Sequence, residues 1–363
     1  MRKVILYLQE RWVFDMKFTK KRKEQIKLYI LEKIFKKDKN FKKSVAESHD
    51  ISKSTVYRYI KELLDDGIIY KSDDFYKLTT ELKYFSYDMK SVKDESDVFD
   101  NDILPLISNL PKNLKNIWCY AFTEMFNNVI DHSDSDRCFV IFSQNQIYTW
   151  IQIMDNGVGI YNKIQSCFKQ KTINQVILDL FKGKLTTDPS RHSGEGIFFT
   201  SKIMDRFYAI SNGYIFTHSN VTDYKECIDE KHPLSNSYKD KDGTTILMVL
   251  SNNSKKELVD IFNMYSNPDN GVTKTVIPMR FACDSGYPIS RSQAKRLTVG
   301  IDIFEEVELD FLDVENIGQS FSDELFRVFA NKHPEIKLIP INANENILKM
   351  IEHVKSNKTL IRI

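Results

Sequence analysis

The sequence predicts a multi-domain α/β protein, and three patterns carry that prediction. Residues 22–80 have the periodicity of three helices followed by a hairpin, residues 103–250 alternate helical and strand patterns, and a compact βαβ-like pattern begins near residue 275. We therefore expect three domains, at residues 1–87, 88–252 and 270–363.

The composition is that of a globular protein. The hydrophobic fraction is 42% and the charged fraction 28%, so the chain of 363 residues has enough apolar side chains for real cores. No run of 18 apolar residues predicts a transmembrane helix, and the first residues lack the features of a signal peptide. Five dispersed cysteines without CxxC spacing argue against a disulfide framework or a zinc site. We expect a cytoplasmic protein with no membrane partner.

Charge is distributed unevenly along the chain. Residues 1–90 carry 22 Lys and Arg against 14 Asp and Glu, whereas the remainder carries 30 against 36. A basic N-terminal module on an acidic body indicates a polyanionic partner at that end. A solvated basic surface is the alternative.

The segment VAESHDISKSTVYRYIKELLDDGII has the layout of a helix-turn-helix. His49 and Asp50 form the turn, and Ser52 or Ser54 is placed to cap the second helix. The apolar residues at helical spacing predict its buried face: Val56, Ile60, Leu63 and Leu64. The residues left exposed are Lys53, Thr55, Tyr57, Arg58 and Lys61.

With the hairpin that follows, this segment resembles a winged helix-turn-helix. The resemblance implies DNA binding through residues 1–87, with the second helix in the major groove and the basic surface on phosphates. A winged helix used for protein contacts or dimerisation is the alternative.

In the central region, AFTEMFNNVIDHS places three polar residues on one helix face. Glu124, Asn128 and His132 are four residues apart. A carboxylate there suits a general base, and a carboxamide oxygen suits Mg²⁺. An ordinary exposed helix face would look the same.

The segment IQIMDNGVGIYN reads as a strand that ends in Asp155, Gly157 and Gly159. The carboxylate can accept the exocyclic amine of adenine, and the glycines let the backbone approach a base closely. A plain turn after a strand is the alternative.

A third motif, RHSGEGIFFTSKIMD, opens a helix at Gly194-Glu195-Gly196, and such a helix start favours phosphate. The polar stretch before it, Phe181–Ser193, is expected to be a lid. Its cations are either solvated or phosphate contacts: Lys182, Lys184, Arg191 and His192, the last two being preferred.

In this order and spacing, the motifs resemble the nucleotide pocket of the GHKL superfamily, and Asp242–Ile246 resembles its late Gly-Thr motif. The resemblance implies a Bergerat-type α/β sandwich whose mixed sheet is covered by helices on one face. It also implies ATP and Mg²⁺ as ligands, Glu124 as the catalytic base, Asn128 as the Mg²⁺ ligand and Asp155 as the adenine acceptor. The remaining residues assigned to the cofactor are His132, Gly157, Gly159, Arg191, His192, Gly194, Glu195, Gly196, Thr244 and Thr245.

The C-terminal region resembles a STAS-like domain of unknown function that often follows GHKL ATPases. The resemblance rests on the strand, loop and amphipathic helix of VELDFLDVENIGQSFSDELFRVFANKHP and on ISRSQAKRL upstream. The expected elements are strands at 299–304, 307–311 and 336–340, with helices at 320–331 and 344–354. Arg291 and Arg296 are expected to face a partner or the ATPase.

Ser320 or Ser322 lies where anti-anti-sigma STAS proteins carry a phosphorylated serine, at the start of the corresponding helix, and Ser320 is the candidate phosphoacceptor. The sequence departs from their Asp-Ser-Ser-Gly with Gly318-Gln319-Ser320-Phe321. A role for Ser320 as the helix N-cap is the alternative.

Together these features predict a regulatory switch protein that binds and hydrolyses ATP and binds DNA. One alternative is a serine/threonine protein kinase of the anti-sigma-factor type that phosphorylates a STAS-like domain or partner. Another is a transcription regulator that uses ATP only as a ligand. An ordinary sensor kinase is not expected, because no helix pair with an acceptor histidine precedes the pocket. A homodimer and a protein partner of the STAS-like domain remain open.

Overall fold

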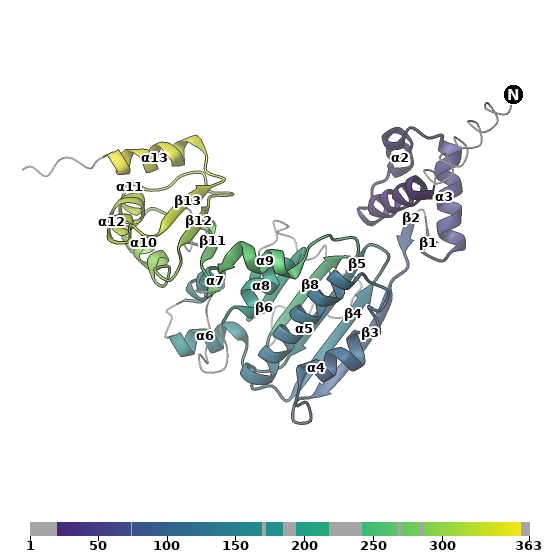
Figure 1. The fold of residues 1–363 in the computed structure, drawn as a ribbon, viewed down its shortest axis with the longest axis horizontal. Coiled ribbons are helices and arrows are strands. Elements are labelled where there is room, and N and C mark those ends of the chain that lie inside the picture. Colours follow the sequence, from purple (N-terminus) through teal and green to yellow (C-terminus); the bar gives the residue numbers. More distant parts are fainter. Residues whose placement is uncertain are drawn as a thin grey trace, which may run out of the picture. The chain divides into compact units, whose positions relative to one another are not determined.

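The computed structural model has a mixed α/β fold (Figure 1). It describes residues 20–73, 75–168, 172–183, 194–217, 242–267, 271–282 and 287–356. The chain forms two compact units. The first contains the described residues through Tyr84 with Ile141–Ile151 and Leu250–Asn253, and the second contains Phe85–Val140, Gln152–Val249 and the chain from Ser254 onward. Within the described ranges, no helix is long and apolar enough to cross a membrane.

The N-terminal region folds as three helices and a hairpin. Its elements are a helix over residues 20–35, α2 (Phe41–His49), α3 (Lys53–Asp65), β1 (Ile69–Ser72) and β2 (Phe75–Leu78). The Ser52 side chain caps α3 by accepting a hydrogen bond from the Thr55 N–H at 3.2 Å. Val56, Ile60 and Leu63 are buried as expected. Tyr59 joins them, so the buried face of α3 is wider than its aliphatic residues indicate.

A six-stranded sheet has the strand order β3-β4-β5-β8-β6-β7. Its strands are β3 (Glu81–Asp88), β4 (Arg137–Gln144), β5 (Tyr148–Asp155), β6 (Arg206–Ser211), β7 (Tyr214–Thr217) and β8 (Thr245–Ser251). Strand β6 is antiparallel to both β7 and β8. Strand β3 runs through residue 87, where the sequence places a domain boundary.

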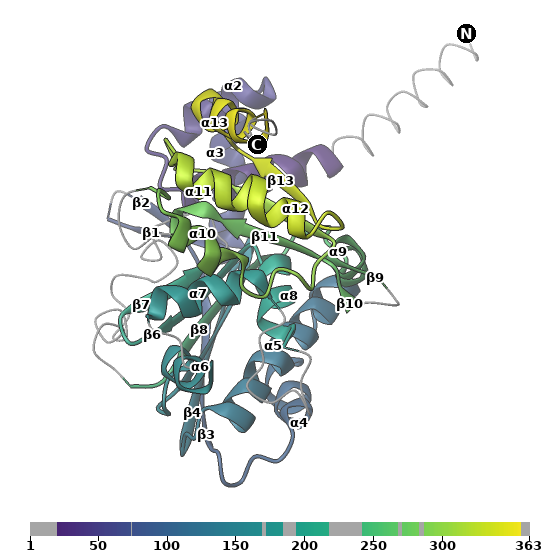
Figure 2. The ribbon, with the colours of Figure 1, turned by 90° about the vertical axis from the view of Figure 1, so that its left-hand side faces the viewer.

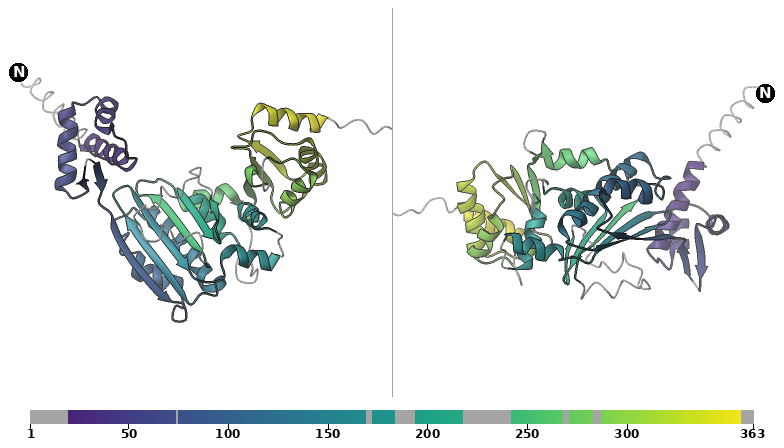
Figure 3. Two further views of the ribbon diagram at one scale, coloured as in Figure 1. Left: turned by 180° about the vertical axis from the view of Figure 1, so that it is seen from behind. Right: turned by 90° about the horizontal axis from the view of Figure 1, so that it is seen from below.

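Helix α5 (Lys112–His132) lies across one face of this sheet (Figure 1), and the opposite face is turned to the reader in the left panel of Figure 3. Its buried residues include Leu114, Trp118 and Phe122, which recur at helical spacing. The other helices of this region are α6 (Ile160–Phe168), α7 (Ile173–Lys182), α8 (Gly196–Ile203) and α9 (Leu258–Tyr265).

The polar and acidic segment at residues 88–102 includes helical structure. It contains α4 (Glu95–Val98) and the first residues of a π-helical turn at Phe99–Ile103. Val98, Phe99 and Ile103 are buried. These few apolar residues pack into the core, although most residues of the segment are polar or acidic.

The C-terminal region has a three-stranded parallel sheet in the order β11-β12-β13, with helices packed around it (Figure 2). Its strands are β11 (Lys274–Pro278), β12 (Glu306–Asp310) and β13 (Lys337–Ile341). The helical elements are η3 (Met279–Phe281), α10 (Arg291–Thr298), α11 (Gln319–Asp323), η4 (Glu324–Phe329), α12 (Ala330–Lys332) and α13 (Glu345–Ser356). A short pair, β9 (Ser266–Asn267) with β10 (Gly271–Val272), precedes the sheet.

The strand expected at residues 299–304 is wrong. Helix α10 starts with a capping box between Ser290 and Gln293 and continues through Thr298, so Val299 is its C-terminal cap. The residues after it form turns that place Ile301 and Phe304 in the core. The apolar residues of this segment are therefore buried without forming a strand. The other elements expected here start and end within two residues of those observed.

Candidate functional site

A cavity of about 270 Å³ lies in the second unit. This volume is near the lower end of the range for small-molecule sites, about 300–1,000 Å³. Four separate segments line it: α5, the end of β5 with α6, the end of α7 with the start of α8, and the start of β8. The expected site residues in the lining are Glu124, Asn128, His132, Asp155, Gly159, Gly194, Gly196 and Thr244.

Helix α5 presents Glu124, Asn128 and His132 to the cavity, each half-buried. Their spacing of four residues puts them on one face, while Phe122 and Phe126 on another face are buried. The Glu124 carboxylate lies against the start of α8: a Cβ atom on Gly196 would be 2.1 Å from Glu124 Oε2. Only glycine lets the carboxylate and that helix start come so close.

Asp155 ends β5 at the cavity wall. Its backbone N–H donates to the Thr244 carbonyl at 3.0 Å, and its Oδ1 accepts from the Gly157 N–H at 2.9 Å. Burial raises the pKa of the Asp155 carboxyl, and hydrogen bonds from Gly157 and Thr244 oppose that rise. The result is a half-buried acceptor, suited to a ligand N–H donor.

The turn after Asp155 is packed tightly against its neighbours. Gly159 has a φ of +81°, a conformation that favours glycine. A Cβ on Gly157 would be 1.9 Å from the Ser133 carbonyl oxygen, which accepts a hydrogen bond from the Val158 N–H at 2.8 Å. Gly157 therefore shapes the site by fitting against the end of α5, although it does not itself line the cavity.

The Gly-Thr motif holds the same turn from the other side. Thr244 Oγ1 accepts a hydrogen bond from the Ile160 N–H at 2.9 Å, at the start of α6. Its hydroxyl also bonds to the Asp155 carboxylate. Thr245, the other threonine assigned to the cofactor, begins β8 and is outside the cavity lining.

Helix α8 begins at the cavity without a side-chain cap. Its N-cap is Glu195, and its first intrahelical bond runs from the Phe199 N–H to the Glu195 carbonyl at 2.9 Å. The N–H groups of the first turn have no partner within a helix, and they carry the positive end of its dipole. Gly196, Ile197 and Phe198 all line the cavity, so this helix start can receive an anion.

Not every residue expected at the site is in this lining. The Glu195 side chain points to the C-terminal region, where its Oε1 accepts from the Val272 N–H at 3.4 Å. Arg191, His192 and Lys184 lie outside the described residues. Lys182 is neither solvated nor free for a phosphate: it is 3% exposed, and its Nζ donates to Asp179 Oδ1 and to the Val299 carbonyl, both at 2.8 Å.

Sequence reasoning missed the apolar wall and one cation. Lys163 on α6 lines the cavity and forms an ion pair with Asp134 at 2.8 Å. The apolar residues of the lining include Ile160, Ile164, Leu180 and Ile246. The spacing of Ile160, Lys163 and Ile164 after the glycine turn was a usable signal, because these positions share one helix face.

On the N-terminal region, α3 exposes the residues that the sequence assigns to DNA. Lys53, Tyr57, Arg58 and Lys61 are exposed, and Thr55 is half-buried. Tyr57 is 53% exposed, and the Lys42 ammonium lies 4.8 Å from its ring centroid. A planar ring beside cations can contact a nucleic-acid backbone or base.

The start of α11 corrects one expectation. Gly318, not Ser320, is the N-cap, and it has no side-chain cap bond. Ser320 is exposed within the first turn, whereas Ser322 is buried and its hydroxyl donates to the Gly318 carbonyl at 3.0 Å.

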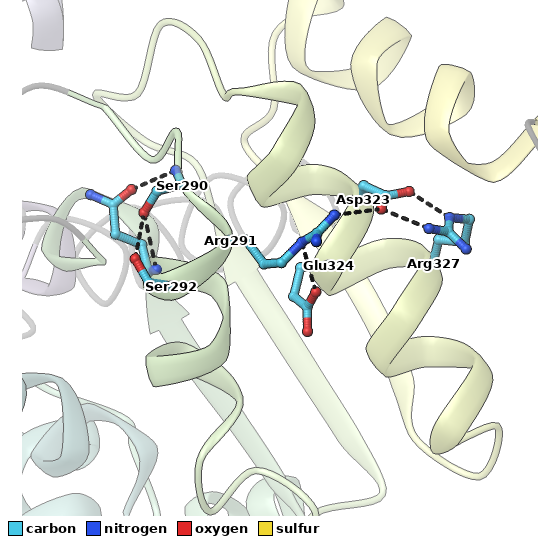
Figure 4. Close-up of polar contacts among 7 residues, drawn as sticks. Ser290, Arg291, Ser292, Asp323, Glu324 and Arg327 are labelled. Atoms are coloured by element: carbon cyan, nitrogen blue, oxygen red, sulfur yellow. Dashed lines mark hydrogen bonds and ion pairs between the residues drawn. The ribbon is translucent and has the colours of Figure 1, made fainter.

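Arg291 forms ion pairs within the C-terminal region. Its guanidinium lies 3.2 Å from Glu324 Oε2 and 3.8 Å from Asp323 Oδ2, and Asp323 is shared with Arg327 at 2.7 Å (Figure 4). Arg291 therefore joins α10 to α11 and η4 within the C-terminal region. Arg296 is exposed, and its expected contact with a partner or the ATPase stays a prediction.

Comparison with known proteins identifies the C-terminal region alone. Residues 293–348 match the family model described as a STAS-like domain of unknown function (DUF4325), so the STAS-like prediction is confirmed for these residues. No curated protein matches the chain.

Proposed function

We propose that the chain binds ATP with Mg²⁺ in the central cavity, as GHKL proteins do, and hydrolyses it as a regulatory switch. One observation carries the proposal: four motifs spread from Glu124 to Thr244 line the same cavity. Their chemistry is complementary, with a carboxylate acceptor, a carboxamide, a second carboxylate and an uncapped helix start. Chance motifs have no reason to meet in this way.

Each group has a role in this proposal. Asp155 accepts the adenine amine, the apolar wall with Ile160 and Ile246 covers the base, and the first turn of α8 binds phosphate oxygens. The Asn128 carboxamide oxygen is a ligand type that Mg²⁺ accepts together with phosphates, and its place on the lining fits that use. Bound Mg²⁺ would supply charge neutralisation at the phosphates.

Glu124 is the proposed general base. Its carboxylate is beside Gly196, where the α8 N–H groups would hold the terminal phosphate. There it can take the proton of an attacking water, a contribution of about 10²–10⁴ in rate.

The test follows the γ-phosphate of labelled ATP with Mg²⁺ for wild type and E124A. We expect label released as free phosphate, a turnover at least about 100-fold lower in E124A, and ATP affinity largely retained. Wild-type turnover by E124A would remove the base assignment. ATP bound but left intact by the wild type would instead favour a ligand-gated regulator.

A protein-kinase activity is the second candidate, favoured by the exposed Ser320 at the start of α11. A helix start accepts a phosphoserine well. If the chain is a kinase, the γ-phosphate label in the same experiment stays on the protein. The S320A variant should then carry no label. S292A is the matched control, because Ser292 is also exposed in the first turn of a helix in this region.

We also propose that the N-terminal region is a winged helix that binds DNA through α3. The support is a row of exposed cations, Lys53, Arg58 and Lys61, on one helix whose other face is buried. Fluorescence anisotropy of labelled duplex DNA with the full chain tests it. R58A and K61A should weaken binding and reduce its salt dependence, whereas K43A on α2 should do so less. Equal binding by all variants would favour a protein-contact role.

A further inference from the structure

The STAS-like domain and the central cavity are joined by one hydrophobic core. Leu178 from α7 and Phe198 and Phe199 from α8 belong to the buried cluster that contains the C-terminal sheet. Two residues of α9 pack against the same cluster: Phe262 meets the Phe199 ring edge-on at 4.7 Å, and Tyr265 meets the Phe198 ring edge-on at 5.3 Å. The helices that border the cavity are thus fixed to the C-terminal region by apolar contacts.

Polar contacts join the same elements. The buried Thr275 hydroxyl on β11 donates to the Phe181 carbonyl of α7 at 3.2 Å. Lys182, one residue further on, donates to the Val299 carbonyl at the end of α10, while Asp179 balances its charge. A buried ammonium with both partners in place is costly to disturb, because removing it takes the donor from the Val299 carbonyl and breaks the ion pair with Asp179.

These contacts lie directly beside the cavity. Leu180 and Gly183 of the α7 segment and Gly194 and Gly196 of the α8 segment are in its lining. Gly183 has a φ of +80°, and a Cβ there would be 2.8 Å from the Phe198 ring. The end of α7 is therefore in close contact with α8, whose first turn faces the cavity.

We propose that Lys182 is a positioning residue through which the STAS-like domain sets the affinity of the cavity for nucleotide. This role rests on the proposed ATP site, and it makes the STAS-like domain of the same chain the regulator of that site. Because coupling between two sites is reciprocal, ATP in the cavity must also tighten the docking of the STAS-like domain. A change at that domain then alters ATP affinity from a distance.

The first measurement needs no variant: hydrogen exchange of the full-length wild type with and without ATP and Mg²⁺. We expect ATP to slow exchange in β11, β12 and the Val299 segment as well as at the cavity. Slower exchange at the cavity alone would overturn the coupling while leaving the ATP site intact.

The second measurement compares ATP affinity in wild type, K182M and K256M. Methionine keeps the length of the side chain and removes the donor. We expect K182M to bind ATP at least about fivefold more weakly, with KM raised and kcat nearly retained, and to lose the ATP effect on β12 exchange. T275V removes the neighbouring hydrogen bond from β11 to the Phe181 carbonyl and is a milder change. It should also weaken ATP binding, and it replaces K182M in the test if K182M folds poorly.

K256M is the matched control. Lys256 Nζ also donates to a backbone carbonyl, that of Ile203 at 2.7 Å, and to a carboxylate, Asp205 at 2.8 Å, and neither of these acceptors is on α7. Its affinity should remain within about twofold of wild type, because its bonds do not reach the cavity lining. Equal affinities in K182M, T275V and wild type would overturn the inference alone, whereas a wild type that binds no ATP would overturn the proposed function and this inference with it.

Discussion

Helices α8 and α10 are both eight residues long, yet they begin in opposite ways. In α10 the Ser290 hydroxyl accepts from the Gln293 N–H at 3.2 Å, and the Gln293 side chain accepts from the Ser290 N–H at 2.8 Å. In α8 the N-cap Glu195 makes no such bond, and the first turn faces a cavity. The start of α10 is thus closed by its own residues, whereas the start of α8 is uncapped where it faces the cavity.

The carboxylates follow the same division. Burial raises the pKa of Asp155, which faces the cavity. In the STAS-like domain the pKa of Asp323 is lowered by its bond to Arg327, and that of Glu306 by its bond to Lys274. One region holds a carboxylate in an unfavourable place, as binding sites do, and the other pairs its carboxylates for stability.

The largest expected effect is the loss of ATP affinity in the D155N variant. A carboxyl whose pKa is raised on folding contributes stability that is lost as pH rises through the folded pKa. D155N should therefore leave the apo protein at pH 7 as stable as wild type or more so. Its ATP affinity should fall about 10- to 100-fold, because a charged acceptor is lost. Calorimetric titration and thermal unfolding measure the two effects. A variant that bound ATP normally would remove Asp155 from the site.

A smaller effect is expected at the closed helix start. S290A removes the capping box of α10 and should cost about 1 kcal/mol of unfolding free energy. S320A is its counterpart, since Ser320 is exposed and caps nothing, and should change stability by less than about 0.5 kcal/mol. Urea unfolding with an unchanged slope gives both values. Equal losses in the two variants would contradict the contrast between the two serines.

The smallest effect concerns Glu306, which lies between Lys274 at 2.7 Å and Lys337 at 3.2 Å on neighbouring strands. Its folded pKa is lowered, so its contribution is present above the unfolded pKa and lost as pH falls through the folded value. E306Q should cost about 1 kcal/mol or less at pH 7, because the pair is partly exposed. The difference from wild type should shrink in acid, which is the opposite sign to Asp155. A difference that grew in acid would refute the ion-pair account.

The polar residues of the cavity lining can be found from local patterns in the sequence. Glu124, Asn128 and His132 follow from the helical period, and Asp155 follows from a strand that ends in a glycine turn. That these motifs line one cavity was an inference from resemblance, and the structure brings most of them together there.

Other features depend on contacts that no local pattern contains. The Val299 carbonyl that accepts a hydrogen bond from Lys182 is 117 residues away in the chain. The local sequence therefore predicts a solvated lysine at position 182. Gly157 is required by the Ser133 carbonyl, which a turn motif cannot indicate. The apolar residues after Val299 predict a strand because residues buried in turns and residues buried in a sheet form similar apolar runs in a sequence.

The shared core has a practical consequence for dividing the chain. A fragment that ended at Asn267 would keep the α5, α8 and β8 sides of the cavity, yet it would uncover Leu178, Phe198 and Phe199 on the side where the C-terminal sheet packs. Each square ångström of apolar surface exposed costs about 25 cal/mol, and a fresh apolar patch invites self-association. Truncation would thus expose an apolar surface beside the cavity. Weak ATP binding or aggregation of such a fragment would therefore not reflect the behaviour of the intact protein.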